Sequence, residues 1–130
     1  MWGRTNKSVW TRGEDAAARF MKKQGCRVLA RNLRLPVGEI DLLCLERATG
    51  TIVIVEVKAR AYHADTHKRI DPIESITTKK QAKLRVLARA IKNMPAYRDA
   101  PIRIDAISVR FEHARRRPVI THYPSCVGDS

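Results

Sequence analysis

Two carboxylates and a lysine occur at spacings that bring them together if the segments that carry them form a hairpin. Residues 39–46 and 51–58 are apolar stretches with alternating or β-branched side chains, which favours two strands. The four residues between them predict a turn that pairs position 46 with 51 and, counting back, Asp41 with Glu56. Directly opposed side chains have Cβ atoms about 4.5–5.5 Å apart. Asp41, Glu56 and Lys58 are therefore expected to converge at the open end of the hairpin.

Such a carboxylate pair suits a divalent metal ion. Like charges opposed in a sheet destabilise it, and Mg²⁺ or Mn²⁺ relieves the repulsion by taking carboxylate oxygens as ligands. We expect Asp41 and Glu56 to hold the metal, with the backbone carbonyl of Val57 as a further ligand. Lys58 would orient a water molecule or stabilise phosphate charge, and Glu14, on the apolar stripe of a first helix, would complete the acidic shell. Metal-dependent hydrolysis of a phosphodiester needs these groups.

The same residues also have a purely structural interpretation. The predicted register opposes Glu39 and Lys58 as well, so that Lys58 could form a solvated ion pair with Glu39 or Glu56, worth about 0–1 kcal/mol. Glu14, close to the start of a helix, would then stabilise the helix dipole. A metal centre and a solvated strand end are both alternatives for these residues.

The charge of the chain indicates a polyanionic partner. Its 130 residues include 26 Lys and Arg against 13 Asp and Glu, a formal net charge of +13. A magnitude of about 2–8 suffices to keep a small domain soluble. Nucleic acid is the expected partner, with DNA favoured over RNA. Aromatic residues, at 5%, do not indicate an aromatic RNA-binding platform. The alternatives are a merely basic surface, an anionic membrane leaflet and an acidic protein partner.

Nothing in the sequence predicts a membrane span or a secreted protein. The apolar run 52–55 is far shorter than the roughly 20 residues that cross a bilayer, and residues 1–7 lack the apolar centre of a signal peptide. Three scattered cysteines are typical of reduced thiols. We expect a cytoplasmic protein with no membrane partner and one domain over residues 1–130, with its core at about 11–123 and short flexible termini.

The periodicity of the whole chain predicts an α/β fold. Thr11 is expected to cap a first helix that ends at Gly25, and Pro95 is expected to end a second helix. That second helix has the length of a crossover between parallel strands. The expected elements are a helix at 11–24, strands at 28–35, 39–46 and 51–58, a helix at 73–93, and strands at 102–111 and, more weakly, 119–123. The α-β-β-β-α-β order predicts a mixed central sheet flanked by helices.

Two motifs carry a resemblance to a known family. Gly38-Glu-Ile-Asp-Leu-Leu and Val55-Glu-Val-Lys-Ala-Arg60 resemble sequences of the YraN-like family, small bacterial proteins that are similar to Holliday-junction resolvases. The resemblance covers about residues 11–123. It implies the restriction-endonuclease-like three-layer core of the PD-(D/E)xK nuclease-like class, with the acids of the hairpin and Lys58 in the signature positions and Glu14 as the acid of the first helix. Ile40 stands where that class usually has a proline.

Several other residues are candidates for binding. Side chains expected to contact nucleic acid are Arg34, Arg60, Lys79, Lys80 and Lys83, although a solvated basic face explains the lysines equally well. The stretch 62–69 predicts a long loop that orders on nucleic acid. His63 and His67 have a helical metal-ligand spacing, but no third ligand is close in sequence, so a zinc site is not expected. Asp105 is expected to terminate or orient a strand.

Together these patterns predict a metal-dependent endonuclease-like protein that binds and hydrolyses structured nucleic acid, DNA rather than RNA. The alternative is a non-catalytic nucleic-acid-binding module with the same fold. Junction resolvases are dimers because their substrate has two-fold symmetry, so the resemblance favours a homodimer, although the sequence identifies no dimer surface.

Overall fold

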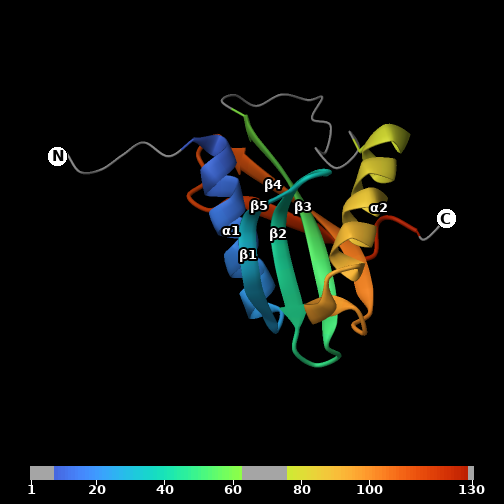
Figure 1. Cartoon of the computed structure of the whole chain (residues 1–130). Coiled ribbons are helices and arrows are strands. Elements are labelled where there is room, and N and C mark those ends of the chain that lie inside the picture. Colours follow the sequence, from blue (N-terminus) through green and yellow to red (C-terminus); the bar gives the residue numbers. More distant parts are fainter. Residues whose placement is uncertain (1–7, 63–75, 129–130) are drawn as a thin grey trace, which may run out of the picture.

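The computed structural model describes residues 8–62 and 76–128, which form two helices packed on a mixed sheet (Figure 1). A short 3₁₀ turn, η2 (Pro95–Tyr97), follows the second helix. The elements in chain order are α1 (Val9–Lys23), β1 (Cys26–Leu35), β2 (Gly38–Glu46), β3 (Thr51–Tyr62), α2 (Thr78–Lys92), β4 (Ile102–Glu112) and β5 (Val119–Tyr123). The predicted α/β class and the predicted element order are confirmed.

The five described strands lie in the order β1-β2-β3-β4-β5. Only β3 and β4 pair in parallel, and the connection between them passes through α2, which is therefore the predicted crossover helix. Helix α1 covers one face of the sheet and α2 covers the other (Figure 1). The α1 side buries small residues of the helix, such as Ala17, against the valines of β3. The α2 side buries Leu84, Leu87 and Ile91 against isoleucines of β3 and β4.

Both helices begin at a different residue from the one predicted. The hydroxyl of Ser8 accepts a hydrogen bond from the backbone N–H of Thr11 at 3.1 Å, so Ser8 is the cap and α1 begins at Val9. Gly25, with a φ of +88°, follows the end of the helix as predicted. Thr77 caps α2 through the N–H of Lys80 at 3.2 Å, so α2 begins at Thr78 rather than at residue 73.

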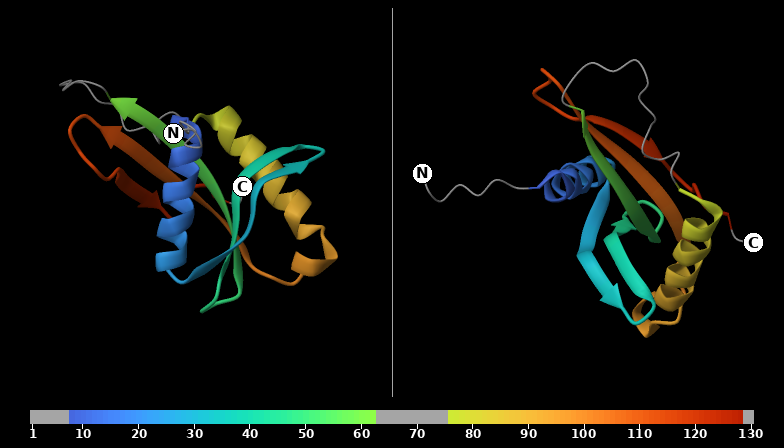
Figure 2. Two further views of the ribbon diagram at one scale, coloured as in Figure 1. Left: turned by 90° about the vertical axis from the view of Figure 1, so that its left-hand side faces the viewer. Right: turned by 90° about the horizontal axis from the view of Figure 1, so that it is seen from above.

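The hairpin of β2 and β3 has the predicted register but is shorter than predicted. Its ladder runs from Glu46 paired with Thr51 to Leu42 paired with Val55. The predicted backbone pairing of Asp41 with Glu56 and of Glu39 with Lys58 is wrong, because beyond Leu42 strand β2 stays paired with β1 while β3 stays paired with β4. The two strands therefore fork, and the β1–β2 ribbon bends away from β3 (Figure 2).

The side-chain alternation of β2 breaks at this fork. Ile40 and Leu43 both belong to the apolar cluster on the α2 side, whereas Leu42 belongs to the cluster on the α1 side. Strict alternation would place Ile40 and Leu42 on one face. On the neighbouring strand Asn32 has a positive φ of 49°, so β1 is irregular at the same level. Asp41 thus lies where the sheet opens.

No helix within the described ranges is long and apolar enough to cross a membrane. The predictions for residues 63–69, including His63 and His67, and for residues 1–7 concern parts of the chain outside the described residues.

Candidate functional site

The carboxylate of Asp41 occupies the opening between β2 and β3. Its Oδ2 accepts a hydrogen bond from the backbone N–H of Val57 at 2.8 Å, and the residue is 8% exposed. The β2–β3 ladder ends at Val55, two residues earlier along β3. The Asp41 oxygen therefore accepts the hydrogen bond that a backbone carbonyl of β2 would otherwise accept. In an antiparallel strand the N–H and C=O of one residue point to the same edge, so the carbonyl of Val57 faces the opening as well.

Glu56 lies beside this opening, on the face of β3 that α2 covers. It is 6% exposed, and its Oε2 receives two ammonium groups: Lys80 Nζ at 3.0 Å, from the first turn of α2, and Lys58 Nζ at 3.6 Å, from β3 itself. Residues two positions apart in a strand project from the same face, which explains why Lys58 also reaches Glu56. Lys80 reaches the site because α2 begins directly over Glu56.

Glu14 approaches the same centre from α1. The preceding Gly13 allows the helix to lie close to β3, because a Cβ at this position would overlap the Cβ of Ala59. Glu14 is 2% exposed; its Oε1 accepts a hydrogen bond from Asn32 Nδ2 at 3.0 Å, and its Oε2 is buried with no hydrogen-bond partner in the described structure. The sequence analysis missed Asn32. The sequence signal that could have indicated it is the tolerance of asparagine for a positive φ.

The acids at this centre perturb one another. Burial above all, and then the nearby carboxylates of Glu56 and Glu14, raise the pKa of Asp41 from 3.8 to about 7, although the hydrogen bond from Val57 acts in the opposite direction. Two ammonium groups contact Glu56, but no cation contacts Asp41 among the described residues. Asp41 therefore lies in a buried, acidic environment without a contacting cation, and a bound cation would favour its charged form.

The structure brings together four of the predicted site residues, Asp41, Glu56, Lys58 and Lys80, with Glu14 close to Asp41. The other predicted nucleic-acid contacts lie elsewhere. Arg34 has a side chain that is 88% exposed and pairs with Glu39 at 3.4 Å. The remaining candidates are Lys79, which is exposed, Lys83, whose Cε lies against Gly38, and Arg60, which donates to the carbonyl of Ala59.

The donors available to a metal ion are two carboxylates and one backbone carbonyl. In the described parts of the chain no three or more His, Cys, Asp and Glu side chains form a metal site by themselves. Arg31 Nη2 lies 3.9 Å from Oε1 of Glu14, but Oε2 of Glu14 accepts no hydrogen bond from the described residues. This unpartnered oxygen and the raised pKa of Asp41 fit a hard divalent cation, which takes carboxylate oxygens as ligands. The oxygen-only donor set excludes a thiolate-type zinc centre.

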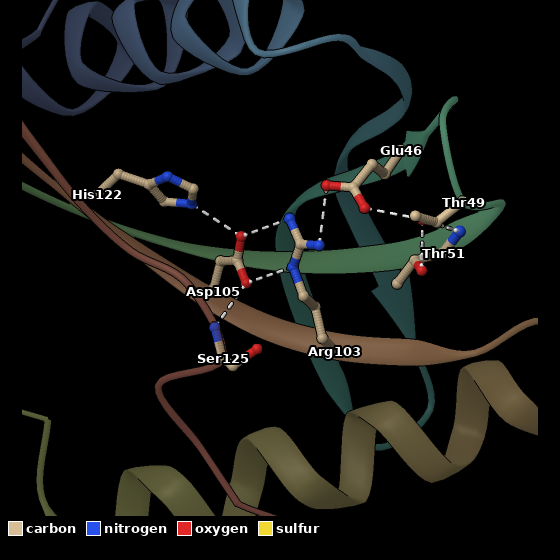
Figure 3. A network of polar contacts seen from close by, with 7 residues as sticks. All are labelled: Glu46, Thr49, Thr51, Arg103, Asp105, His122 and Ser125. Atoms are coloured by element: carbon tan, nitrogen blue, oxygen red, sulfur yellow. Dashed lines mark hydrogen bonds and ion pairs between the residues drawn. The ribbon is translucent and has the colours of Figure 1, made fainter.

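A further buried carboxylate, outside the site around Asp41, was underestimated from the sequence. Asp105 is fully buried in the middle of β4, so it does not terminate the strand. Its oxygens accept hydrogen bonds from Arg103 Nε at 3.0 Å and from the N–H of Ser125 at 2.9 Å, and they contact His122 Nε2 at 2.8 Å (Figure 3). Arg103 also pairs with Glu46 at 2.9 Å. The network orients β5 and the segment after it. Its sequence signal is an aspartate within an apolar strand.

The fold and the site together define an α/β domain with a buried acid–lysine centre at a fork between two strands. The chain belongs to the uncharacterised protein family UPF0102, whose model matches residues 13–109. This match confirms the family resemblance that the two motifs of the hairpin indicated.

Relatives in this family match most of the chain. A UPF0102 protein of Renibacterium salmoninarum is 38% identical over 120 residues, covering 86% of this chain and 97% of the relative. A UPF0102 protein of Mycobacterium avium is 40% identical over 110 residues, covering 85% and 82%. Among solved structures, SfsA of Pyrococcus furiosus in complex with Ca²⁺ is similar with a TM-score of 0.45 and 15% identity, covering 91% of this chain and 65% of SfsA.

Proposed function

We propose that this protein is a divalent-metal-dependent phosphodiesterase that cleaves structured nucleic acid, DNA rather than RNA. The observation that carries the proposal is the hydrogen bond between the Asp41 carboxylate and the N–H of Val57, which places a second buried acid beside Glu56. Two acids and two lysines at one opening in the sheet provide both metal ligands and cations for phosphate charge.

Each residue has a separate role in this proposal. Asp41, Glu56 and the carbonyl of Val57 would hold Mg²⁺ or Mn²⁺. The metal would stabilise charge on a phosphoryl oxygen and lower the pKa of water. Lys58 would orient the attacking water or stabilise the phosphate, and Lys80, which contacts Glu56, would supply a second cation for phosphate charge. Glu14 would complete the acidic shell from α1 with its unpartnered Oε2.

The sheet surface beyond Glu56 supports an anionic substrate. On the α2 side of the sheet, Lys58 of β3 is paired with Ser108 of β4, and the next row pairs Arg60 with Arg110. Adjacent residues of parallel strands project from the same face, so two rows of side chains extend from the acidic centre. Ser108 is fully buried, whereas Lys58 is partly exposed and Arg60 is exposed. Phosphate oxygens are suitable acceptors for the exposed ends of Lys58 and Arg60.

The size and charge of the substrate follow from the composition. A net charge of +13 favours a partner with many phosphates. Arg34, Lys79 and Lys83 carry exposed charge at the rim and would contact the sugar-phosphate backbone. A branched substrate with two-fold symmetry would be matched by a homodimer.

The experiment compares metal-dependent cleavage of a branched DNA by the wild type, Glu56→Ala and the control variant Glu39→Ala. Glu39 lies on the same hairpin but is exposed and contacts Arg34 rather than the acid centre. We expect Glu56→Ala to lower the cleavage rate at least about a hundredfold while DNA affinity is retained, and Glu39→Ala to cleave normally. Unchanged cleavage by Glu56→Ala would refute the assignment.

A second candidate is a nucleic-acid-binding module that does not cleave. The ion pair between Lys80 and Glu56, at 3.0 Å, favours it, because a resident ammonium already neutralises one of the two acids. Calorimetric titration with Mn²⁺, with and without branched DNA, separates the two functions. Metal binding that disappears in Asp41→Asn supports the enzyme. The binding module is supported if the wild type binds DNA and its Mn²⁺ binding, if any, is unchanged in Asp41→Asn.

A further inference from the structure

A basic cavity lies away from the acid centre, between α2, the start of β4 and the residues after β5. Its volume is about 250 Å³. None of its lining residues belongs to the acid centre. Four successive lining positions, Arg85, Ala88, Arg89 and Lys92, share one face of α2 because they follow the helical repeat.

Three cationic residues of α2 line this cavity, and two of them are held in place by backbone carbonyls. Arg85 Nε donates to the carbonyl of Gly128 at 2.9 Å, and Lys92 Nζ donates to the carbonyl of Ala100 at 2.6 Å. Arg89 is exposed and has no ion pair within the described structure. None of the described residues that line the cavity is acidic. Arg103, which also lines the cavity, is neutralised by Glu46 and Asp105. The side chains from α2 thus concentrate positive charge, with no acidic side chain among the described residues of the cavity wall.

The floor of the cavity is apolar. Ile102, Ile104 and Val127 line it opposite the helix, together with Ala88. Ile104 and Val127 are part of the apolar core, so the floor is held rigidly by the packing beneath it. A ligand that matches these walls has a negative group for the cations and a flat, weakly polar group for the aliphatic surface.

We propose that this cavity binds a nucleotide, with its phosphate against Arg89 and the held cations and its base against the aliphatic floor. The choice of a nucleotide rests on the proposed function, whereas the need for an anion rests on the cavity alone. Ligand pockets usually measure about 300–1,000 Å³, so this cavity of about 250 Å³ would hold no more than one nucleotide unit. The nucleotide is either free or part of a nucleic-acid strand that extends from the acid centre.

The first experiment titrates the protein with deoxyadenosine monophosphate and, separately, with inorganic phosphate, and follows methyl resonances by NMR. We expect the methyl signals of Ile102 and Val127 to shift with the nucleotide and to shift much less with phosphate. Arg89→Ala should weaken nucleotide binding about tenfold or more, because a charge-assisted contact is lost. The control Arg19→Ala, an exposed arginine of α1, should bind like the wild type.

The second experiment repeats the comparison with a labelled single-stranded oligonucleotide. Binding of the free nucleotide that depends on Arg89 assigns the cavity to a mononucleotide. Oligonucleotide binding that depends on Arg89, without binding of the free nucleotide, assigns it to a nucleotide within a strand. The proposal is overturned if neither ligand is affected by Arg89→Ala, or if the free nucleotide binds but shifts the methyl signals no more than phosphate does. Asp41→Asn should bind the nucleotide normally, so failure at the acid centre is distinguishable from failure here.

Discussion

Replacing Asp41 by asparagine should stabilise the metal-free protein at neutral and alkaline pH. The carboxylate of Asp41 is buried beside two other acids, and its pKa is raised from 3.8 to about 7. Asparagine keeps a side-chain oxygen that can accept the hydrogen bond from Val57 but carries no charge. The substitution therefore removes an unfavourable charge and preserves the geometry.

The sign and the size of this effect follow from proton linkage. Below pH 3.8 Asp41 is protonated in both the folded and the unfolded protein. Between pH 3.8 and about 7 the unfolded chain has released its proton and the folded protein still holds it, so the wild type loses stability as the pH rises. Above this range the loss is complete and reaches at most about 4 kcal/mol. After allowing for a weaker hydrogen bond from Val57, we expect Asp41→Asn to be more stable by about 2–3 kcal/mol at pH 8.

Urea unfolding in EDTA at pH 4, 6 and 8 measures the difference between the wild type and Asp41→Asn. Titration of groups that do not interact with Asp41 cancels in this difference. We expect it to be close to zero or in favour of the wild type at pH 4 and to increase with pH in favour of the variant. Addition of Mn²⁺ at pH 8 should stabilise the wild type alone, because a ligand stabilises the state that binds it. A difference that is constant with pH would refute the electrostatic argument.

Two further predictions concern the residues that position the site. Gly13→Ala should destabilise the protein by about 1–3 kcal/mol, since the new methyl group overlaps the Cβ of Ala59. Adding Ala59→Gly should restore much of this stability in urea unfolding, and purely additive effects of the two substitutions would contradict the close contact. Asp105→Ala should cost about 3 kcal/mol or more in thermal unfolding, because it leaves Arg103 and His122 without their buried partner. A loss below about 1 kcal/mol would show that the network contributes little.

The sequence alone predicts those features that depend on neighbouring residues. The spacing of the turn determines the register from Leu42 with Val55 to Glu46 with Thr51, and the structure confirms it. The periodicity of apolar residues determines the order of helices and strands, and the length of the segment between β3 and β4 determines their parallel pairing. Asp41 and Glu56 were recognised as neighbours for the same reason, although the ladder ends before it reaches them.

The tertiary structure decides what depends on competition between distant segments. β2 leaves β3 at Asp41 because its outer half stays paired with β1, and a pattern within one hairpin contains no information about that third strand. Hydrophobic periodicity likewise does not report how closely α1 packs on Ala59, where α2 places Lys80, or which groups enclose Asp105. Local spacing determines which residues share a face, whereas packing between elements determines which of their charges meet.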